Sequence, residues 1–265
     1  MGYCGREDWK DMSDFVVHFT KPVADKRPLP TAEEATPTSH RGLPAWVAEL
    51  RARDHSGYYP WIDILWEGRL RTGSKPLGAA RKVAPVAALH HVVCFSEIPL
   101  DMLARLIERR SLYGIGFRKD VLVGKDGAPL WYLDKDGVQA QIIQSQIRDR
   151  ISSGVDPLDP LWKLTPFIDN PGNYAQRTYR FEWEREWRVV GDMLFDPADV
   201  AFLFLPEEDH AKARQFFSDA EVGHTGPAYL CHYIDPCWEL AQIQDALSNV
   251  PDAPPPSPGI TPWWL

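Results

Sequence analysis

The segment FEWEREWRVV (residues 181–190) is the most informative stretch of this 265-residue chain. We predict a strand over residues 179–190, in which successive side chains point to opposite faces. The three glutamates of the segment then share one face with Arg188, while its aromatic residues anchor the opposite face. Neighbouring carboxylates on one face repel each other. The pattern therefore indicates either a solvated edge that Arg188 screens, or an acidic wall in a cleft that stabilises a cation.

Other strands and helices are expected on both sides of this segment. Short β-branched and aromatic runs predict strands at residues 14–20, 91–95, 115–123, 129–133, 201–205 and 228–234. Apolar residues at helical spacing predict helices at residues 46–53, 61–70, 99–110, 137–151, 210–217 and 236–247. A long loop is expected at 152–176. Because strands and helices mix without strict βαβ alternation, the predicted fold class is α+β.

Composition and charge exclude several classes of protein. The chain is 44% hydrophobic and 25% charged, which excludes a disordered chain, a collagen and a coiled coil. Its formal net charge of -8 disfavours a protein that coats duplex DNA, because phosphate contacts need clustered Lys and Arg. We expect one domain over residues 1–250, with a loop insertion at 21–45. A proline-rich tail at 251–265 follows and ends in Trp-Trp-Leu.

The expected compartment is the cytoplasm. No apolar run approaches the ~18 residues of a membrane span, and the charged N-terminus MGYCGREDWKD lacks the apolar stretch of a signal peptide. The four cysteines do not have the ligand spacing of a zinc site, so we expect reduced thiols and no metal. Walker A, G-x-S-x-G and H-E-x-x-H motifs are absent from the sequence, so it carries no local signature of ordinary phosphoryl or acyl chemistry.

Three short segments carry candidate ligand-binding groups. His18 and Thr20 share one side of the first predicted strand and would suit a ribose or an amide, whereas the bland alternative is a core histidine. The glycines that follow Tyr113 permit close approach of the backbone to a ligand. The alternative there is a strand start softened by glycine, with surface Arg and Lys. Ser96 precedes a predicted helix start, where an anion can bind.

Six motifs, read in order, carry a resemblance to a known family. They are HFT (18–20), DILWEGRL (63–70), VCFSEIPL (93–100), YGIGFRK (113–119), PLWY (129–132) and EREWRVV (184–190). The series resembles the AbiGi family of bacterial abortive-infection proteins, across most of residues 14–190. It is also similar, more remotely, to ADP-ribosyltransferases, including the DarT type that modifies DNA.

The similarity to ADP-ribosyltransferases implies a split β-sandwich with flanking helices, and NAD as the substrate. Breaking the bond between nicotinamide and ribose leaves an oxocarbenium-like centre, which a fixed carboxylate on the ribose would stabilise by roughly 3–4 kcal/mol. On this resemblance Glu186 is the catalytic glutamate, and Glu184 orients or deprotonates the acceptor. His18 matches the first motif and Tyr113 the middle one, for which Tyr132 is the alternative.

The same resemblance implies a set of contacts to NAD. His18 and Thr20 would hold the adenosine-side ribose, Tyr113 would stack on nicotinamide, and Arg118 would meet the pyrophosphate. The full implied set is His18, Thr20, Ser96, Tyr113, Phe117, Arg118 and Tyr132.

These observations lead to three predicted functions. The first is an NAD-dependent mono-ADP-ribosyltransferase in anti-phage defence or a toxin–antitoxin system, with a protein or nucleic acid as acceptor. The alternative is a non-catalytic antitoxin or regulator on the same fold, which binds a cognate partner through its acidic face and Trp-rich tail. A third is an NAD glycohydrolase that releases free ADP-ribose.

Overall fold

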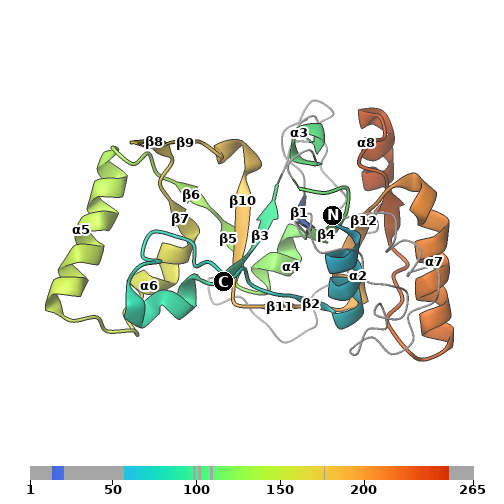
Figure 1. Cartoon of the computed structure of the whole chain (residues 1–265), viewed down its shortest axis with the longest axis horizontal. Helices are drawn as coiled ribbons and strands as arrows, with labels where there is room; N and C mark the ends of the chain where they lie inside the picture. Colours follow the sequence, from blue (N-terminus) through green and yellow to red (C-terminus); the bar gives the residue numbers. More distant parts are fainter. Residues whose placement is uncertain are drawn as a thin grey trace, which may run out of the picture.

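A seven-stranded sheet runs through the centre of the molecule (Figure 1). The computed structural model describes residues 14–20, 57–97, 100, 103–107, 110–175 and 177–250. The strands of the sheet are β1 (Phe15–Phe19), β3 (Val92–Ser96), β4 (Gly114–Arg118), β5 (Ala128–Pro129), β10 (Glu186–Val190), β12 (Val200–Phe204) and β13 (His232–Ile234). Their order is β13-β12-β4-β1-β3-β10-β5, and all neighbours are antiparallel except the parallel pair β12 and β13.

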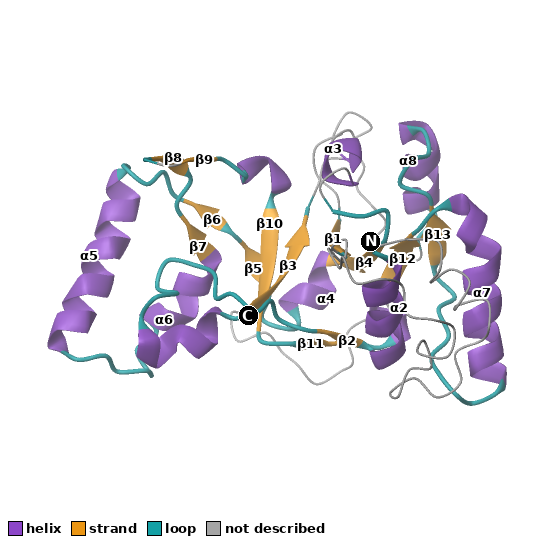
Figure 2. Ribbon diagram, viewed as in Figure 1, coloured by secondary structure: helices purple, strands orange, loops and turns teal. Residues whose placement is uncertain are grey.

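Helices gather at both ends of this sheet (Figure 2). At the β12–β13 end lie α2 (Tyr58–Glu67), α7 (Glu207–Val222) and α8 (Leu240–Ser248), and α3 (Leu103–Ile107) and α4 (Lys119–Val123) lie nearer the middle. At the other end lie α5 (Val138–Ser153), α6 (Leu161–Leu164) and three short 3-10 helices: η1 (Ala84–His90), η3 (Thr165–Phe167) and η4 (Glu182–Glu184). A further 3-10 helix, η5 (Pro197–Asp199), precedes β12.

Three two-stranded pairs complete the described structure. The pairs are β2 (Arg69–Leu70) with β11 (Met193–Leu194), β6 (Trp131–Tyr132) with β7 (Ile168–Asp169), and β8 (Gly172–Tyr174) with β9 (Arg177–Tyr179). The pair of β6 and β7 is parallel, and it connects the end of the main sheet to the long segment before β10. The α+β class is therefore confirmed. The principal strands form one continuous sheet, whereas the resemblance implied two sheets packed as a sandwich.

Alternation along the strands divides the apolar side chains into two cores. One face of the sheet packs Val16, Phe95 and Phe117 against aromatic residues of α2 and α7. The other face packs Val17 and other residues of β1 and β12 against α3 and α8. Because each large apolar side chain contributes about 1.5–3 kcal/mol when fully buried, these two layers hold the sheet between its helices. A third, smaller cluster joins α5 and α6 to η1.

The predicted strand over residues 179–190 is wrong in its first half. The segment forms the 3-10 helix η4, then Arg185 adopts a left-handed backbone (φ 43°), and β10 begins at Glu186. An extended strand would have placed the three glutamates side by side. The turn instead sends Glu184 to Arg110, with 3.1 Å between carboxylate and guanidinium, and leaves Glu186 beside Arg188.

Other expectations hold in part. Strands β1, β3 and β12 and helices α2, α5, α7 and α8 overlap the predicted elements. The predicted strand 115–123 ends at Arg118 and continues as helix α4, and the strand 129–133 is divided between β5 and β6. The predicted loop 152–176 contains α6, η3, β7 and β8. The expected helix 46–53, the insertion 21–45 and the tail 251–265 lie outside the described residues.

Gly116 of β4 offers a test of how tightly the second core is packed. A Cβ at Gly116 would lie 2.4 Å from a ring carbon of Phe202, whereas a Cβ at the exposed Gly73 would meet nothing within 4 Å. We expect Gly116→Ala to lower the free energy of unfolding by about 1–3 kcal/mol through overpacking. Gly73→Ala is the matched control and should change it by less than about 0.5 kcal/mol. Urea titration measures both, and equal effects would contradict the packing described.

Candidate functional site

Arg188 is the most unusual charged residue of the described structure, because its side chain is only 1% exposed in the middle of β10. Its Nε donates to Glu186 Oε1 at 2.7 Å, and its Nη1 donates to the carbonyl of Pro166 at 2.5 Å. The Asp169 carboxylate lies 3.6 Å from its Nη2. Burial would lower the pKa of the guanidinium, but the charge and hydrogen bond of Glu186 raise it overall. Arg188 therefore stays charged and needs these partners.

Two tyrosines extend this network. The backbone N–H of Glu186 donates to the hydroxyl of Tyr132 at 3.0 Å, and the Tyr179 hydroxyl donates to Asp169 Oδ2 at 2.5 Å. Burial raises the pKa of both phenols, so both remain protonated at neutral pH. Asp169 thus accepts from Tyr179 while it faces the guanidinium of Arg188. We call Glu186, Arg188, Asp169, Tyr179 and Tyr132 the Arg188 network.

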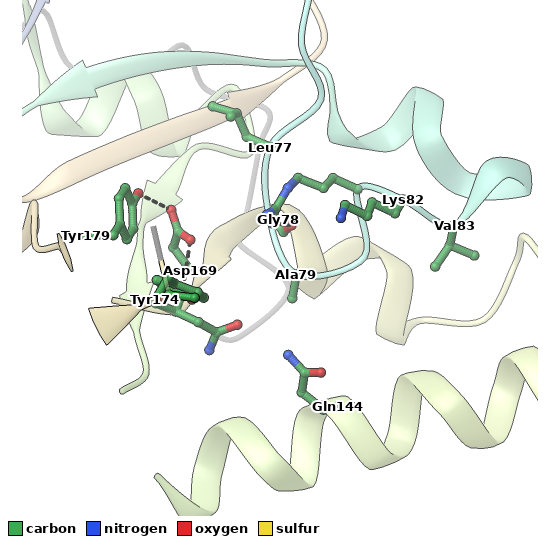
Figure 3. A pocket seen from close by; sticks show the side chains of 12 residues that line it. Leu77, Gly78, Ala79, Lys82, Val83, Gln144, Asp169, Tyr174 and Tyr179 are labelled. Atoms are coloured by element: carbon green, nitrogen blue, oxygen red, sulfur yellow. Dashed lines mark hydrogen bonds between the residues drawn. The ribbon is translucent and has the colours of Figure 1, made fainter. Parts of the chain in front are cut away.

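A cavity of about 780 Å³ adjoins the Arg188 network (Figure 3). Its walls are the segment 77–83, Gln144 of α5, and residues of β7 to β9 that include Asp169 and Tyr179. Figure 3 shows Lys82 and Gln144 on one side of the space, and Asp169, Tyr174 and Tyr179 on the other. Asp169 both lines the cavity and pairs with Arg188, so the Arg188 network forms part of the cavity wall.

The wall segment 77–83 is fixed by close contacts with η3. Gly78 has φ +96°, and a Cβ there would lie 2.3 Å from the carbonyl oxygen of Thr165, so this backbone conformation requires glycine. The N–H of Ala79 donates to the same carbonyl at 2.9 Å. His90, which is fully buried, bridges the Val86 carbonyl and the Thr165 hydroxyl at 3.0 Å each, and burial lowers its pKa. A neutral His90 therefore holds Thr165 in place, and Thr165 in turn fixes the wall segment 77–83.

Two residues that the resemblance places in an NAD site are packed inside the protein. Tyr113 is buried between α2 and α7, and its hydroxyl donates to Asp209 at 3.2 Å. Burial, first, and the Asp209 charge raise the pKa of this phenol. Thr20 is buried too, and its hydroxyl contacts the Gly57 carbonyl at 2.8 Å and the Ser111 hydroxyl at 2.7 Å.

His18 and Glu186 lie on opposite faces of the sheet. His18 pairs with Ile115 in the register of β1 and β4, and its ring lies 5.8 Å from that of Phe95. Glu186 pairs with Ser96, which follows Phe95 in β3. Because successive side chains of a strand alternate, Ser96 and Glu186 point to the face opposite that of Phe95 and His18. The nitrogen Nδ1 of His18 lies 2.9 Å from the Cys94 carbonyl. The structure therefore does not bring His18, Tyr113 and Glu186 into one cleft.

The remaining predicted site residues have varied surroundings. Phe117 is in the core, with its ring 5.8 Å from that of Phe95. Arg118 donates to the carbonyl of Val250 at 3.2 Å and lies over the ring of Phe15. Glu186, Ser96 and Tyr132 are brought together at the start of β10, and Glu184 is buried beside Arg110. Their roles in NAD chemistry stay predictions.

Sequence reasoning missed the residues that form the cavity. Arg188 was expected to screen glutamates at a solvated edge, but it is buried with its own ion-pair partners. Asp169 lay in a segment predicted to be a loop, and nothing in its neighbours marks it as a partner of Arg188. The one available signal was an arginine flanked by Trp187 and Val189, because a charge inside an apolar strand needs a buried partner.

The part of the chain that the structure describes contains neither a membrane-spanning helix nor a group of metal ligands. No described helix is both long and apolar enough to span a membrane. Likewise, among the described residues, no three His, Cys, Asp or Glu side chains are grouped as a metal site would need.

The ion pair of Glu186 and Arg188 gives a stability prediction. We expect Glu186→Gln to lower the free energy of unfolding by about 3 kcal/mol, because it leaves the buried guanidinium without its principal counter-charge. Glu182→Gln is the matched control: Glu182 has no ion-pair partner among the described residues and should cost less than about 0.5 kcal/mol. Urea unfolding measures both variants. A Glu186→Gln protein as stable as the wild type would refute the structural role given to this carboxylate.

Comparison with known families locates the cavity within a recognised segment. Residues 77–219, more than half of the chain, match the family described as "Putative abortive phage resistance protein AbiGi, antitoxin". The whole cavity wall and the Arg188 network fall inside this match, whereas β1 and α8 fall outside it. No curated protein and no solved structure matches the chain. The chain therefore belongs to the AbiGi family.

Proposed function

We propose that this protein is the antitoxin of an abortive-infection system and that it acts by binding a cognate toxin protein. The description of its family as an antitoxin supports this role. The geometry at Glu186 supports a mode of action without chemistry at that residue. The proposal corresponds to the second function predicted from the sequence.

The observation that carries the proposal is the engagement of the Glu186 carboxylate. It accepts from the Arg188 side chain at 2.7 Å, and its own side chain is 16% exposed. Its Oε1 is therefore committed to a buried guanidinium, and removing this counter-charge from Arg188 would cost about 3–5 kcal/mol. A ribose that displaced Arg188 from the carboxylate would meet a cost as large as the roughly 3–4 kcal/mol that a preorganised group contributes to a transition state.

The end of the molecule formed by α7 and α8 suits a basic protein partner. Residues 207–250 carry eight Asp and Glu but two Lys and Arg, and most of these acidic residues are exposed. Large apolar side chains are exposed in the same region, with Val222 at 77% and Leu230 at 86%. The negative charge of such a surface attracts a basic partner over distance. Its exposed apolar side chains add buried apolar area once the two proteins are in contact. We therefore assign the toxin-binding surface to this end.

Co-expression with the product of the neighbouring gene tests the proposal. We expect the two proteins to co-purify, and the chain to relieve any growth arrest that the partner causes. Charge reversal at two exposed positions of α7, Glu208→Lys with Glu221→Lys, should weaken binding at least about tenfold by removing favourable electrostatics. Asp149→Lys, a single charge reversal at an exposed position of α5, is the control for each of the two substitutions and should bind as the wild type does.

ADP-ribosyl transfer and NAD hydrolysis are the competing proposals, and labelled NAD separates them from the antitoxin role. The antitoxin proposal is contradicted if the wild type labels a protein or nucleic acid, and a folded Glu186→Gln variant loses both labelling and protection. It is equally contradicted if the partner neither co-purifies nor is neutralised. Release of free ADP-ribose without a labelled acceptor would indicate the hydrolase.

A further inference from the structure

We propose that the cavity beside the Arg188 network binds a nucleotide, with its phosphate at Arg81 and Lys82 and its base against Tyr174. This inference does not depend on the antitoxin role or on the toxin-binding surface at the opposite end of the molecule. It rests on the size of the cavity, its preformed walls, its two exposed cations and its aromatic wall.

The size and rigidity of the cavity favour a small organic ligand. About 780 Å³ lies within the range of small-molecule sites, which is roughly 300–1,000 Å³. One wall is fixed through Gly78 and Ala79 against Thr165, and the opposite wall is fixed through Asp169 to the buried Arg188. Walls held in this way need little ordering when a ligand binds, which favours affinity.

Arg81 and Lys82 provide positive charge at the cavity. Both side chains are exposed, and neither forms an ion pair with a carboxylate of the described residues. Arg81 donates through Nη1 to the carbonyl of Gly78 at 2.8 Å, which orients its guanidinium and leaves further N–H groups for a ligand. Adjacent Arg and Lys donors suit a phosphate group, because charge-assisted hydrogen bonds to its oxygens are short and strong.

The opposite wall suits a flat ring. Tyr174 lines the cavity with 44% of its surface exposed, and its hydroxyl is fixed by donation to the Asn170 carbonyl at 2.6 Å. Lys135 Nζ lies over this ring, 5.8 Å from its centroid. Because the ring is already held at its hydroxyl, it needs little further ordering when a nucleobase stacks on the face that Lys135 leaves open. Tyr179 continues this wall, and its hydroxyl is held by Asp169.

Gln144 supplies a hydrogen-bonding group for the edge of a base. Figure 3 shows its side chain reaching from α5 toward the segment that carries Ala79. An amide has both donor and acceptor atoms, as the edges of nucleobases do. Inorganic phosphate would use the cations alone and leave this amide and the aromatic wall without a ligand. The combination of cations, ring and amide therefore favours a nucleotide over a simple anion.

Isothermal titration of the full-length chain with ATP, GTP, CTP and UTP, and with inorganic phosphate and NAD, tests this inference. We expect at least one nucleotide to bind, and to bind at least about tenfold more tightly than inorganic phosphate. The double variant Arg81→Ala with Lys82→Ala should raise the Kd about tenfold or more through lost phosphate contacts. Tyr174→Ala should raise the Kd for the nucleotide about tenfold through lost stacking, and leave that for phosphate unchanged.

The control is Lys163→Ala, which removes an exposed cation of α6 outside the cavity wall and should change the Kd less than about twofold. All the substituted side chains are exposed, so folding is checked simply by circular dichroism and thermal unfolding. The inference is overturned if no nucleotide binds, if phosphate binds as tightly as every nucleotide, or if Lys163→Ala weakens binding as much as the cavity variants. Binding of NAD, a dinucleotide, that the cavity variants weaken would support the inference and would also favour the ADP-ribosyl hypothesis.

Discussion

The buried guanidinium of Arg188 constrains one half of this molecule. A positive charge with almost no access to water is stable only when counter-charges and acceptors surround it. These groups come from separate segments: Glu186 from the same strand, the Pro166 carbonyl from η3, and Asp169 from β7. The chain between α5 and β10 must therefore fold back onto the face of β10, and in doing so it builds the cavity wall.

The ion pair with Arg188 gives Glu186 a structural role, although its sequence context resembles that of a catalytic glutamate. Glu186 lies at the start of a strand, two residues after another glutamate, as the ADP-ribosyltransferase pattern would have it. In the folded protein both carboxylates serve arginines, Glu184 with Arg110 and Glu186 with Arg188. Glu186 thus neutralises a buried charge, and Glu184, itself buried, pairs with a half-buried one.

Local sequence patterns predict those elements whose apolar residues follow a regular period. The strand around His18, the strand before Ser96 and the helix over α5 fall in this class, and so does the α+β class itself. The motif series also indicated the AbiGi family, which the match over residues 77–219 confirms. What the patterns miss depends on contacts between distant residues. The break at Arg185 accompanies the separate arginine partners of Glu184 and Glu186, and one wall of the cavity includes Asp169, which pairs with Arg188.

A double-mutant cycle on Glu186 and Arg188 tests the central claim most directly. The variants Glu186→Gln, Arg188→Met and their combination are compared with the wild type by urea unfolding. If Glu186 exists to neutralise a buried Arg188, the double variant loses about 2 kcal/mol less than the sum of the two single losses, because removal of both charges leaves neither without a partner. Losses that add to within about 0.5 kcal/mol would show two independent side chains, and would contradict the account.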